Sequence, residues 1–145
     1  MSFAVDVNVL LYATDSTLPE YNEARDFRES CMEGPDLFYI AWPTVMGYLR
    51  MATHPSLFAS PLTPDEAEKN IQALISLPHV RMLAEAEGFW DCYRSISTDL
   101  PIRGNLVPDA HLAALLRQHG VKTIFTRDRD FRKFPFLKVK DPFSK

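Results

Sequence analysis

The chain has 145 residues, of which 46% are hydrophobic and 24% charged, and its formal net charge is −3. This length and composition fit one globular domain, which we expect to span residues 1–145. No hydrophobic run approaches the ~20 residues that cross a bilayer, and the N-terminus lacks the basic segment of a signal peptide. These features exclude a membrane-spanning or secreted chain and predict a cytoplasmic protein.

The first third of the chain predicts strands that alternate with helices. The first six residues indicate a short buried strand that ends at Asp6. Gly34-Pro35 ends the second helix, and Pro43 stands in the first turn of the third, where a missing N–H costs nothing. In chain order we expect a strand over 1–6, helices over 7–13 and 19–32, a strand over 37–41 and a helix over 43–53.

The rest of the chain continues the alternation. The segment 55–64 contains three prolines and is expected to be a loop. It leads into Thr63-Pro-Asp-Glu66, a capping box that opens a helix. A further helix over 86–96 presents Phe89, Trp90, Tyr93 and Ile96 on its apolar side. We then expect a helix over 108–119 ended by Gly120, and strands over 80–83, 122–126 and 137–140, with one helical turn over 130–133.

This order of elements predicts an α/β fold. Short strands alternating with helices favour a mainly parallel central sheet with helices on both faces. Ligands of such sheets bind at the carboxyl ends of the strands. Acidic residues just after a strand, or at the start of a helix, are therefore the candidates for a functional site.

Four aspartates meet this criterion. Asp6 ends the first strand, where it is either a ligand or the N-cap of the next helix. Asp109 follows Pro108, at the second or third position of its helix, where the helix dipole also favours an acid. Asp128 and Asp130 directly follow a strand. They do not belong to an EF-hand, because the glycine and glutamate that such a calcium loop requires are absent.

The parallel sheet is expected to gather these acids at one edge. Crowded carboxylates repel each other unless a cation neutralises them, and oxygen ligands alone suit Mg²⁺ or Mn²⁺. Such an ion activates water for phosphodiester cleavage. We therefore predict a metal site at Asp6, Asp109 and Asp128. The four histidines are too scattered for zinc, and no G-x-S-x-G or phosphate-binding glycine loop is present.

Charge is distributed unevenly along the chain. Residues 127–145 contain seven Lys and Arg against three Asp, which gives a net charge of +4 and leaves −7 for the rest. A basic segment beside an acidic site fits a phosphate-bearing ligand, although a solvated C-terminal face explains the charge equally well. Cys31 and Cys92 both lie in helical, apolar stretches, which predicts buried free thiols and a reducing compartment.

Three motifs occur in order: Asp6-Val-Asn8-Val-Leu-Leu-Tyr, Asn105-Leu-Val-Pro-Asp109-Ala-His and Thr126-Arg-Asp128-Arg-Asp130-Phe. Together they resemble the PIN-domain ribonucleases, specifically the VapC toxins of bacterial toxin–antitoxin pairs, over residues 3 to about 143. The resemblance implies a parallel sheet between helices and a Mg²⁺- or Mn²⁺-dependent endoribonuclease. It also implies inhibition by a VapB-type antitoxin.

The same resemblance assigns roles to individual residues. It carries metal binding onto Asp6 and Asp109, and next onto Asp128. Asp130 becomes a supporting catalytic acid, or else the residue that caps the turn before Phe131. Thr126 and Asn8 become polar supports near the metal.

One position departs from the family pattern. Met46-Gly-Tyr-Leu-Arg50 places Gly47 where the family usually has a glutamate. Either the site works with its aspartates alone, or another acid reaches in, or the nuclease is weak. The alternative function is thus a weak or inactive PIN fold that binds RNA or an antitoxin. Arg50 is either a contact for RNA phosphate or a member of a surface salt bridge.

Other enzyme classes fit less well. A haloacid-dehalogenase-like phosphatase needs a second aspartate where this chain has Asn8. A receiver domain needs clustered acids near the first strand and a late lysine, whereas the late strand here ends in Thr-Arg-Asp. The stretch 38–51, with Trp42, Tyr48 and Leu49, is either a partner surface or ordinary core. A homodimer is expected from the resemblance.

Overall fold

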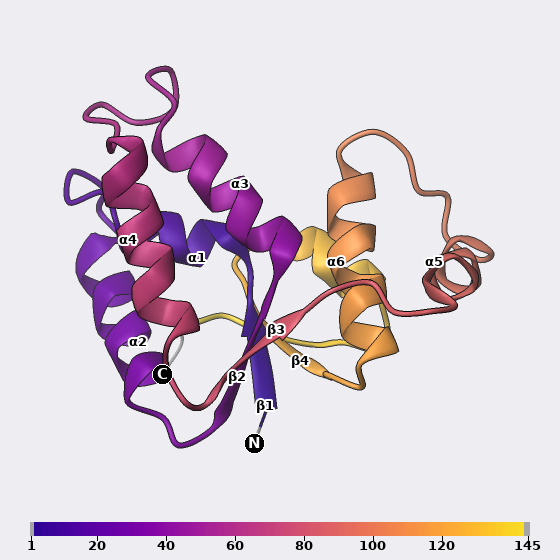
Figure 1. The fold of residues 1–145 in the computed structure, drawn as a ribbon. Helices are drawn as coiled ribbons and strands as arrows, with labels where there is room; N and C mark the ends of the chain where they lie inside the picture. The colour runs from indigo at the N-terminus through magenta and orange to yellow at the C-terminus, as the bar shows by residue number, and fades with distance from the viewer. Residues whose placement is uncertain (1, 144–145) are drawn as a thin grey trace.

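The computed structural model describes residues 2–143, which form a parallel sheet with helices on both sides (Figure 1). The strands in this range are β1 (Ser2–Val5), β2 (Leu37–Ala41), β3 (Val80–Leu83), β4 (Thr123–Phe125) and β5 (Lys138–Lys140). The helices are α1 (Val7–Tyr12), α2 (Tyr21–Glu33), α3 (Trp42–Ala52), α4 (Pro64–Ile75), α5 (Phe89–Ser97), α6 (Leu106–Gln118) and the short 3-10 helix η1 (Arg129–Lys133). The predicted α/β class is confirmed.

The strand order β3-β2-β1-β4-β5 puts the first strand at the centre of the sheet. All neighbouring strands run parallel, so their carboxyl ends meet at one edge. β1 and β4 are paired at Val5 and Phe125, and the N–H of Asp6 donates to the carbonyl of Phe125 at 3.1 Å. The sheet therefore brings Asp6 and the residues after β4 side by side, although about 120 residues separate them in sequence.

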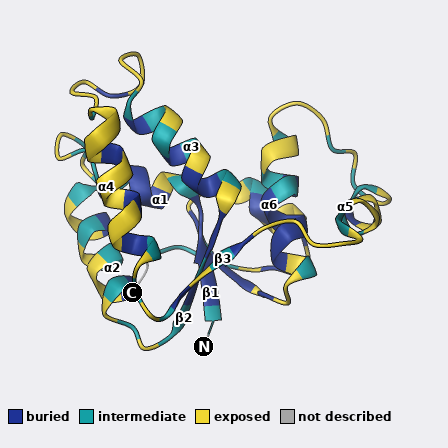
Figure 2. Cartoon of the chain, viewed as in Figure 1, coloured by how far each residue is buried: buried dark blue, intermediate teal, exposed yellow. Residues whose placement is uncertain are grey.

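Two hydrophobic cores fill the space on either side of the sheet. One joins the strands to α1–α4, and the other joins them to α5, α6 and η1. Figure 2 shows that burial follows this division, with dark strands and helices that are dark only on their inner faces. α6 contributes the most thoroughly buried stretch, Leu112–Leu116, in which no residue is more than 6% exposed. This packing holds the first turn of α6 at the same edge as the ends of β1 and β4.

α6 begins two residues earlier than predicted. Its first turn winds from Gly104, whose positive φ of 57° reverses the chain, and the N–H of Val107 donates to Gly104. Pro108 is therefore the third residue of the helix, where its missing N–H has no partner in any case. The prediction that Asp109 is the second or third residue is wrong, because it is the fourth.

α5 also differs from its prediction. It begins at Phe89 rather than Ala86, because Gly88 adopts a left-handed conformation with φ of 83°. Trp90 was expected on the apolar side but is 64% exposed, whereas Ile96 is buried. The ring of Trp90 stacks on Tyr93, with centroids 5.8 Å apart. The helix packs mainly against α6, so only a narrow side of it is covered.

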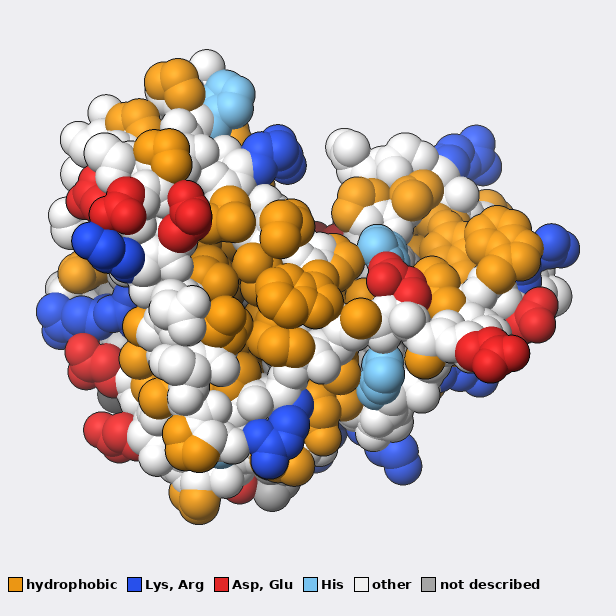
Figure 3. Space-filling view, in the orientation of Figure 1, with side chains coloured by type: hydrophobic (Ala, Val, Ile, Leu, Met, Phe, Trp, Pro, Cys, Tyr) orange, Lys and Arg blue, Asp and Glu red, His pale blue; other side chains and the backbone are white. Residues whose placement is uncertain are grey.

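The stretch 38–51 divides between core and surface. Phe38 and Tyr48 are buried, as the core alternative predicts, whereas Trp42 and Met46 are 39% and 56% exposed. Figure 3 shows hydrophobic side chains gathered over α3 and towards α6 on the viewed face. Part of the predicted partner surface therefore remains open to solvent.

Some smaller predictions can be compared with the structure. Thr63 and Glu66 form the capping box at the start of α4. Both cysteines are free thiols, as predicted, and Cys31 is buried, which raises its pKa to about 12. The prediction that Cys92 is buried is wrong, because it is only partly buried. Within residues 2–143, no helix has the length and hydrophobicity needed to cross a bilayer.

Candidate metal centre

Asp6, Asp109, Asp128 and Asp130 lie at the carboxyl edge of the sheet, and we call them the acidic site. Asp6 directly follows β1 and is buried, with 7% of its surface exposed. Asp109 stands in the first turn of α6. Asp128 precedes η1 and Asp130 is its second residue. A strand end, a helix start and a turn after a strand thus supply the four side chains.

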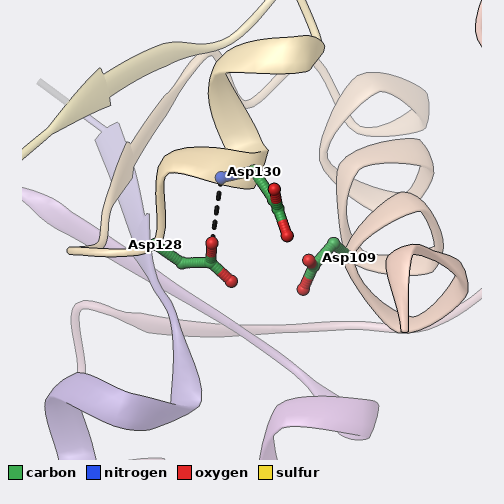
Figure 4. A group of neighbouring side chains, drawn as sticks. All are labelled: Asp109, Asp128 and Asp130. Carbon is green, nitrogen blue, oxygen red and sulfur yellow. Dashed lines mark hydrogen bonds between the residues drawn. The ribbon is translucent and has the colours of Figure 1, made fainter.

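Three of these carboxylates converge most closely. One oxygen each from Asp109, Asp128 and Asp130 lies within 4.8 Å of the other two. Figure 4 shows the three side chains directed towards a common space between η1 and α6. We call them the carboxylate triad. The predicted ligand set was Asp6, Asp109 and Asp128, so the geometry brings Asp130 into the group and leaves Asp6 outside it.

Asp6 is joined to the triad through Thr126. The hydroxyl of Thr126 donates to Oδ2 of Asp6 at 2.9 Å and accepts from the N–H of Asp128 at 2.9 Å. Thr126 is itself buried, with 2% of its surface exposed. This buried bridge fixes the Asp6 carboxylate relative to the start of η1. The predicted polar support by Thr126 thus corresponds to a specific pair of hydrogen bonds.

The capping alternatives can be compared with the geometry. Asp6 occupies the N-cap position of α1, but its side chain makes no capping hydrogen bond. Asp128 does cap η1, because its Oδ1 accepts from the N–H of Asp130 at 2.9 Å. Asp130, the acid for which capping was the alternative, instead pairs with Lys133 at 3.2 Å. Lys133 was missed, although its i+3 spacing from Asp130 in a helical turn was a usable signal.

Crowding and burial perturb two of the acids. Desolvation raises the pKa of Asp109 to about 7, and the charges of Asp128, Asp6 and Asp130 add to the effect. Burial also raises the pKa of Asp6, against the hydrogen bond from Thr126, which lowers it. Near neutral pH the site therefore carries negative charge that the protein compensates only in part.

The remaining predicted residues lie around this centre. Asn8 is exposed, and within residues 2–143 no hydrogen bond links its side chain to the acids. Gly47 and Arg50 line a cleft that also includes Asp6 and Asp109. No salt bridge of Arg50 exists in the described part of the chain, which removes the support for its salt-bridge alternative.

The donor set suits a small divalent cation. Mg²⁺ binds oxygen at about 2.1 Å, so ligands on opposite sides of the ion lie roughly 4.2 Å apart. Oxygens that already lie within 4.8 Å of one another need only a small movement to share one ion. An all-carboxylate set favours Mg²⁺ or Mn²⁺ over zinc or copper. The raised pKa of Asp109 indicates the charge that such an ion would neutralise.

Comparisons with known proteins bear on the family and the fold. Residues 3–137 match the family model of the PIN domain. Ribonuclease VapC48 of Mycobacterium tuberculosis is 49% identical over 144 residues, which cover 99% of each chain. The solved structure of VapBC2 from Rickettsia felis, bound to a promoter DNA fragment, has a TM-score of 0.68 at 15% identity and covers 97% of this chain and 98% of its own.

A second solved structure is that of M. tuberculosis VapC20, described as a toxin that cleaves the sarcin-ricin loop. It superposes with a TM-score of 0.64 at 14% identity and covers 90% of this chain and 92% of its own. At such low identities the solved structures support the fold, whereas the relative at 49% identity supports the family.

Replacing Asp109 by Asn is expected to stabilise the metal-free protein at alkaline pH. The pKa of Asp109 is about 7 in the folded chain and has an ordinary value of 3.8. Between pH 3.8 and pH 7, the folded chain therefore keeps Asp109 protonated, whereas the unfolded chain does not. The contribution of protonated Asp109 to the free energy of unfolding is fully present below pH 4 and is lost as the pH rises through 7. In EDTA at pH 8, D109N should exceed wild type by about 1–2 kcal/mol, after allowance for solvent screening of a half-exposed group.

Urea unfolding at pH 5 and pH 8, with EDTA or with Mg²⁺, measures this difference. The advantage of D109N should shrink at pH 5 and with Mg²⁺, which offsets the repulsion in wild type. The matched control is Glu68→Gln, at an exposed position on α4. A D109N protein that is less stable than wild type at pH 8 in EDTA would contradict the assigned repulsion.

Proposed function

This chain belongs to the PIN-domain family, among its VapC ribonucleases, and from that premise we propose that it is the RNA-cleaving toxin of a toxin–antitoxin pair, with the acidic site as its active site. The sequence-based assignment to this family, and to the ribonucleases as an enzyme class, is confirmed. The metal, the residues that bind it and the molecular partners are parts of the proposal.

The observation that supports the site most directly is the carboxylate triad. Three acids from two separate elements bring oxygens within 4.8 Å of each other, despite the repulsion that this creates. An arrangement that costs stability in the free protein is typical of a functional site. The divalent ion that we propose for it is Mg²⁺, with Mn²⁺ as the alternative.

Each acid has its own part in the proposed mechanism. Asp109, Asp128 and Asp130 would hold the ion, and Asp130 would then no longer be paired with Lys133. Asp6, fixed by Thr126, lies behind them as a buried negative charge or a further ligand. When bound, a divalent ion in such a site activates water and stabilises the charge that develops on the scissile phosphate.

The basic C-terminal segment supplies the attraction for RNA. Around η1, Arg129 and Arg132 are exposed, and Lys133 stands beside the triad. Cations at the margin of a negative site attract the phosphate backbone of RNA towards that site. For basic residues nearer the C-terminus, such as Lys138, the alternative explanation of a solvent-exposed face remains.

A second candidate function follows from Gly47. The resemblance places a glutamate there, so the chain has one acid fewer than the family pattern. A PIN fold that binds RNA or an antitoxin without cutting is therefore the competing proposal. The two differ in a single property, metal-dependent cleavage.

The partners are proposed by analogy with the relatives. VapBC2 of Rickettsia felis is described as bound to promoter DNA, and we propose a VapB-type antitoxin for this chain too. We also propose that residues 1–145 act as one domain, since the family match covers 3–137. The cytoplasm remains the proposed compartment, because Cys31 and Cys92 are free thiols.

Cleavage of total RNA with Mg²⁺, Mn²⁺ or EDTA tests the proposed function. Wild type should cut only with metal, and a VapB-type protein should stop it. D109N and D128N should lower the rate of RNA cleavage at least about 100-fold. Mutation of residues that only hydrogen-bond to metal ligands already lowers metal affinity or activity 10–100-fold. Glu68→Gln on α4 is the control and should cut like wild type. Absence of cleavage under every condition would favour the binding function, and full cleavage by D109N would refute the site.

The exposed hydrophobic side chains of α3 and α6 support a homodimer. Trp42 and Val107 are 39% and 43% exposed, which is costly for large apolar groups in a free monomer. Light scattering at micromolar concentration should give twice the chain mass of 16.6 kDa. Val107→Glu should shift the protein to a monomer, whereas Glu68→Gln should not. A wild type that is strictly monomeric would contradict the dimer.

A further inference from the structure

A cleft of about 370 Å³ opens directly beside the acidic site. Asp6 and Asp109 line it, together with the apolar side chains of Met46, Met51 and Leu112. Its volume is at the lower end of the roughly 300–1,000 Å³ that is usual for small-molecule sites. The cleft can therefore hold a group of limited size next to a bound metal.

Gly47 contributes to the width of this cleft. Its φ is not positive, so the backbone does not require glycine there. A Cβ at this position would stand 3.6 Å from Cε of Met51 and 3.7 Å from Cγ2 of Val7, which are ordinary contacts. A glycine inside a helix lowers the stability of the helix by about 1 kcal/mol relative to alanine. The missing side chain thus has no structural benefit for α3, and its effect is to keep the cleft open.

Arg50 gives the cleft a positive charge. It lies on the same helix, one turn after Gly47, and its side chain is exposed. Among residues 2–143 it forms neither a salt bridge nor a side-chain hydrogen bond, although Asp6 and Asp109 line the same cleft. A cation that is not engaged with these acids is available for an anion from outside the protein.

These features together match one nucleotide. The thioethers of Met46 and Met51 suit the face of a flat aromatic ring. An arginine binds phosphate through its planar fork of donors. A nucleobase reaches a narrow cleft only when it is unstacked and unpaired, as in single strands and loops. Asp6 and Asp109 line the same cleft, so a base held in it would place the adjoining phosphate beside the acidic site.

We propose that this cleft, opened by Gly47, binds one unpaired nucleobase of the RNA next to the scissile phosphate, while Arg50 binds a neighbouring phosphate. The inference rests on the proposed ribonuclease function and adds two residues, Gly47 and Arg50, as determinants of substrate binding. The position that lacks the family's glutamate becomes a determinant of substrate binding.

Three variants at one position test the cleft. Gly47→Ala adds only a Cβ to the cleft and should raise KM for a single-stranded RNA by less than Gly47→Leu does. Gly47→Leu fills the cleft without adding charge and should raise KM for a single-stranded RNA at least 10-fold, with kcat changed less than threefold. Gly47→Glu adds a carboxylate as well as bulk, so its comparison with Gly47→Leu separates the effect of an added acid from the effect of lost space. Mn²⁺ binding, measured by electron paramagnetic resonance, should stay close to wild type in Gly47→Ala and Gly47→Leu, and thermal unfolding should show that both variants are folded.

An RNA that lacks one base provides the decisive comparison. Removing the base beside the cut should raise KM for wild type at least 10-fold, whereas Gly47→Leu should treat the intact and abasic RNAs alike. Arg50→Gln should weaken the binding of RNA 3- to 10-fold and reduce the salt dependence of that binding. Arg25→Gln on α2 is the control and should change neither.

The outcomes distinguish the inference from the function on which it rests. If wild type cuts RNA and Gly47→Leu cuts the intact RNA with an unchanged KM, the cleft does not bind a base and the inference is overturned. If base-paired RNA is cut as efficiently as single-stranded RNA, it is overturned as well. If wild type cuts no RNA at all, the proposed function itself has failed.

Discussion

Four carboxylates meet at the carboxyl edge of the sheet, and their mutual repulsion has to be offset by a proton or by a cation. The free protein shows the first solution, because the pKa of Asp109 is raised to about 7. Lys133 offsets part of the charge through Asp130. A divalent ion offers a stronger solution, since it converts the repulsion into coordination. Metal binding and folding are therefore expected to be coupled at this edge.

The parallel sheet makes this convergence unavoidable. With β1 at the centre and β4 beside it, the residues after both strands emerge at one place. The buried hydroxyl of Thr126 then fixes Asp6 and the backbone of Asp128 relative to each other. The buried stretch of α6 completes the arrangement, because its packing against the sheet holds Asp109 over the same edge.

Much of this architecture could be predicted from the sequence, because strand and helix ends have local signals. The positions of Asp6, Asp109 and Asp128 at element ends followed from periodicity, proline and glycine alone. Which carboxylates share one space depends instead on how η1 is rotated, and a 3-10 turn has no periodic signal. The resemblance to the PIN-domain ribonucleases assigned Asp130 only a supporting role. The exposure of Trp90 also depends on tertiary packing, since an apolar face is buried only where another element covers it.

The central claim is that the carboxylate triad holds a divalent ion, and a crystal structure with Mn²⁺ tests it most directly. Anomalous scattering at the manganese edge should reveal one or two ions, with oxygens of Asp109, Asp128 and Asp130 at roughly 2.0–2.2 Å. Asp6 should then be a direct ligand or stand one water away. An ion bound elsewhere, or no anomalous peak at the triad in millimolar Mn²⁺ at pH 8, would contradict the account.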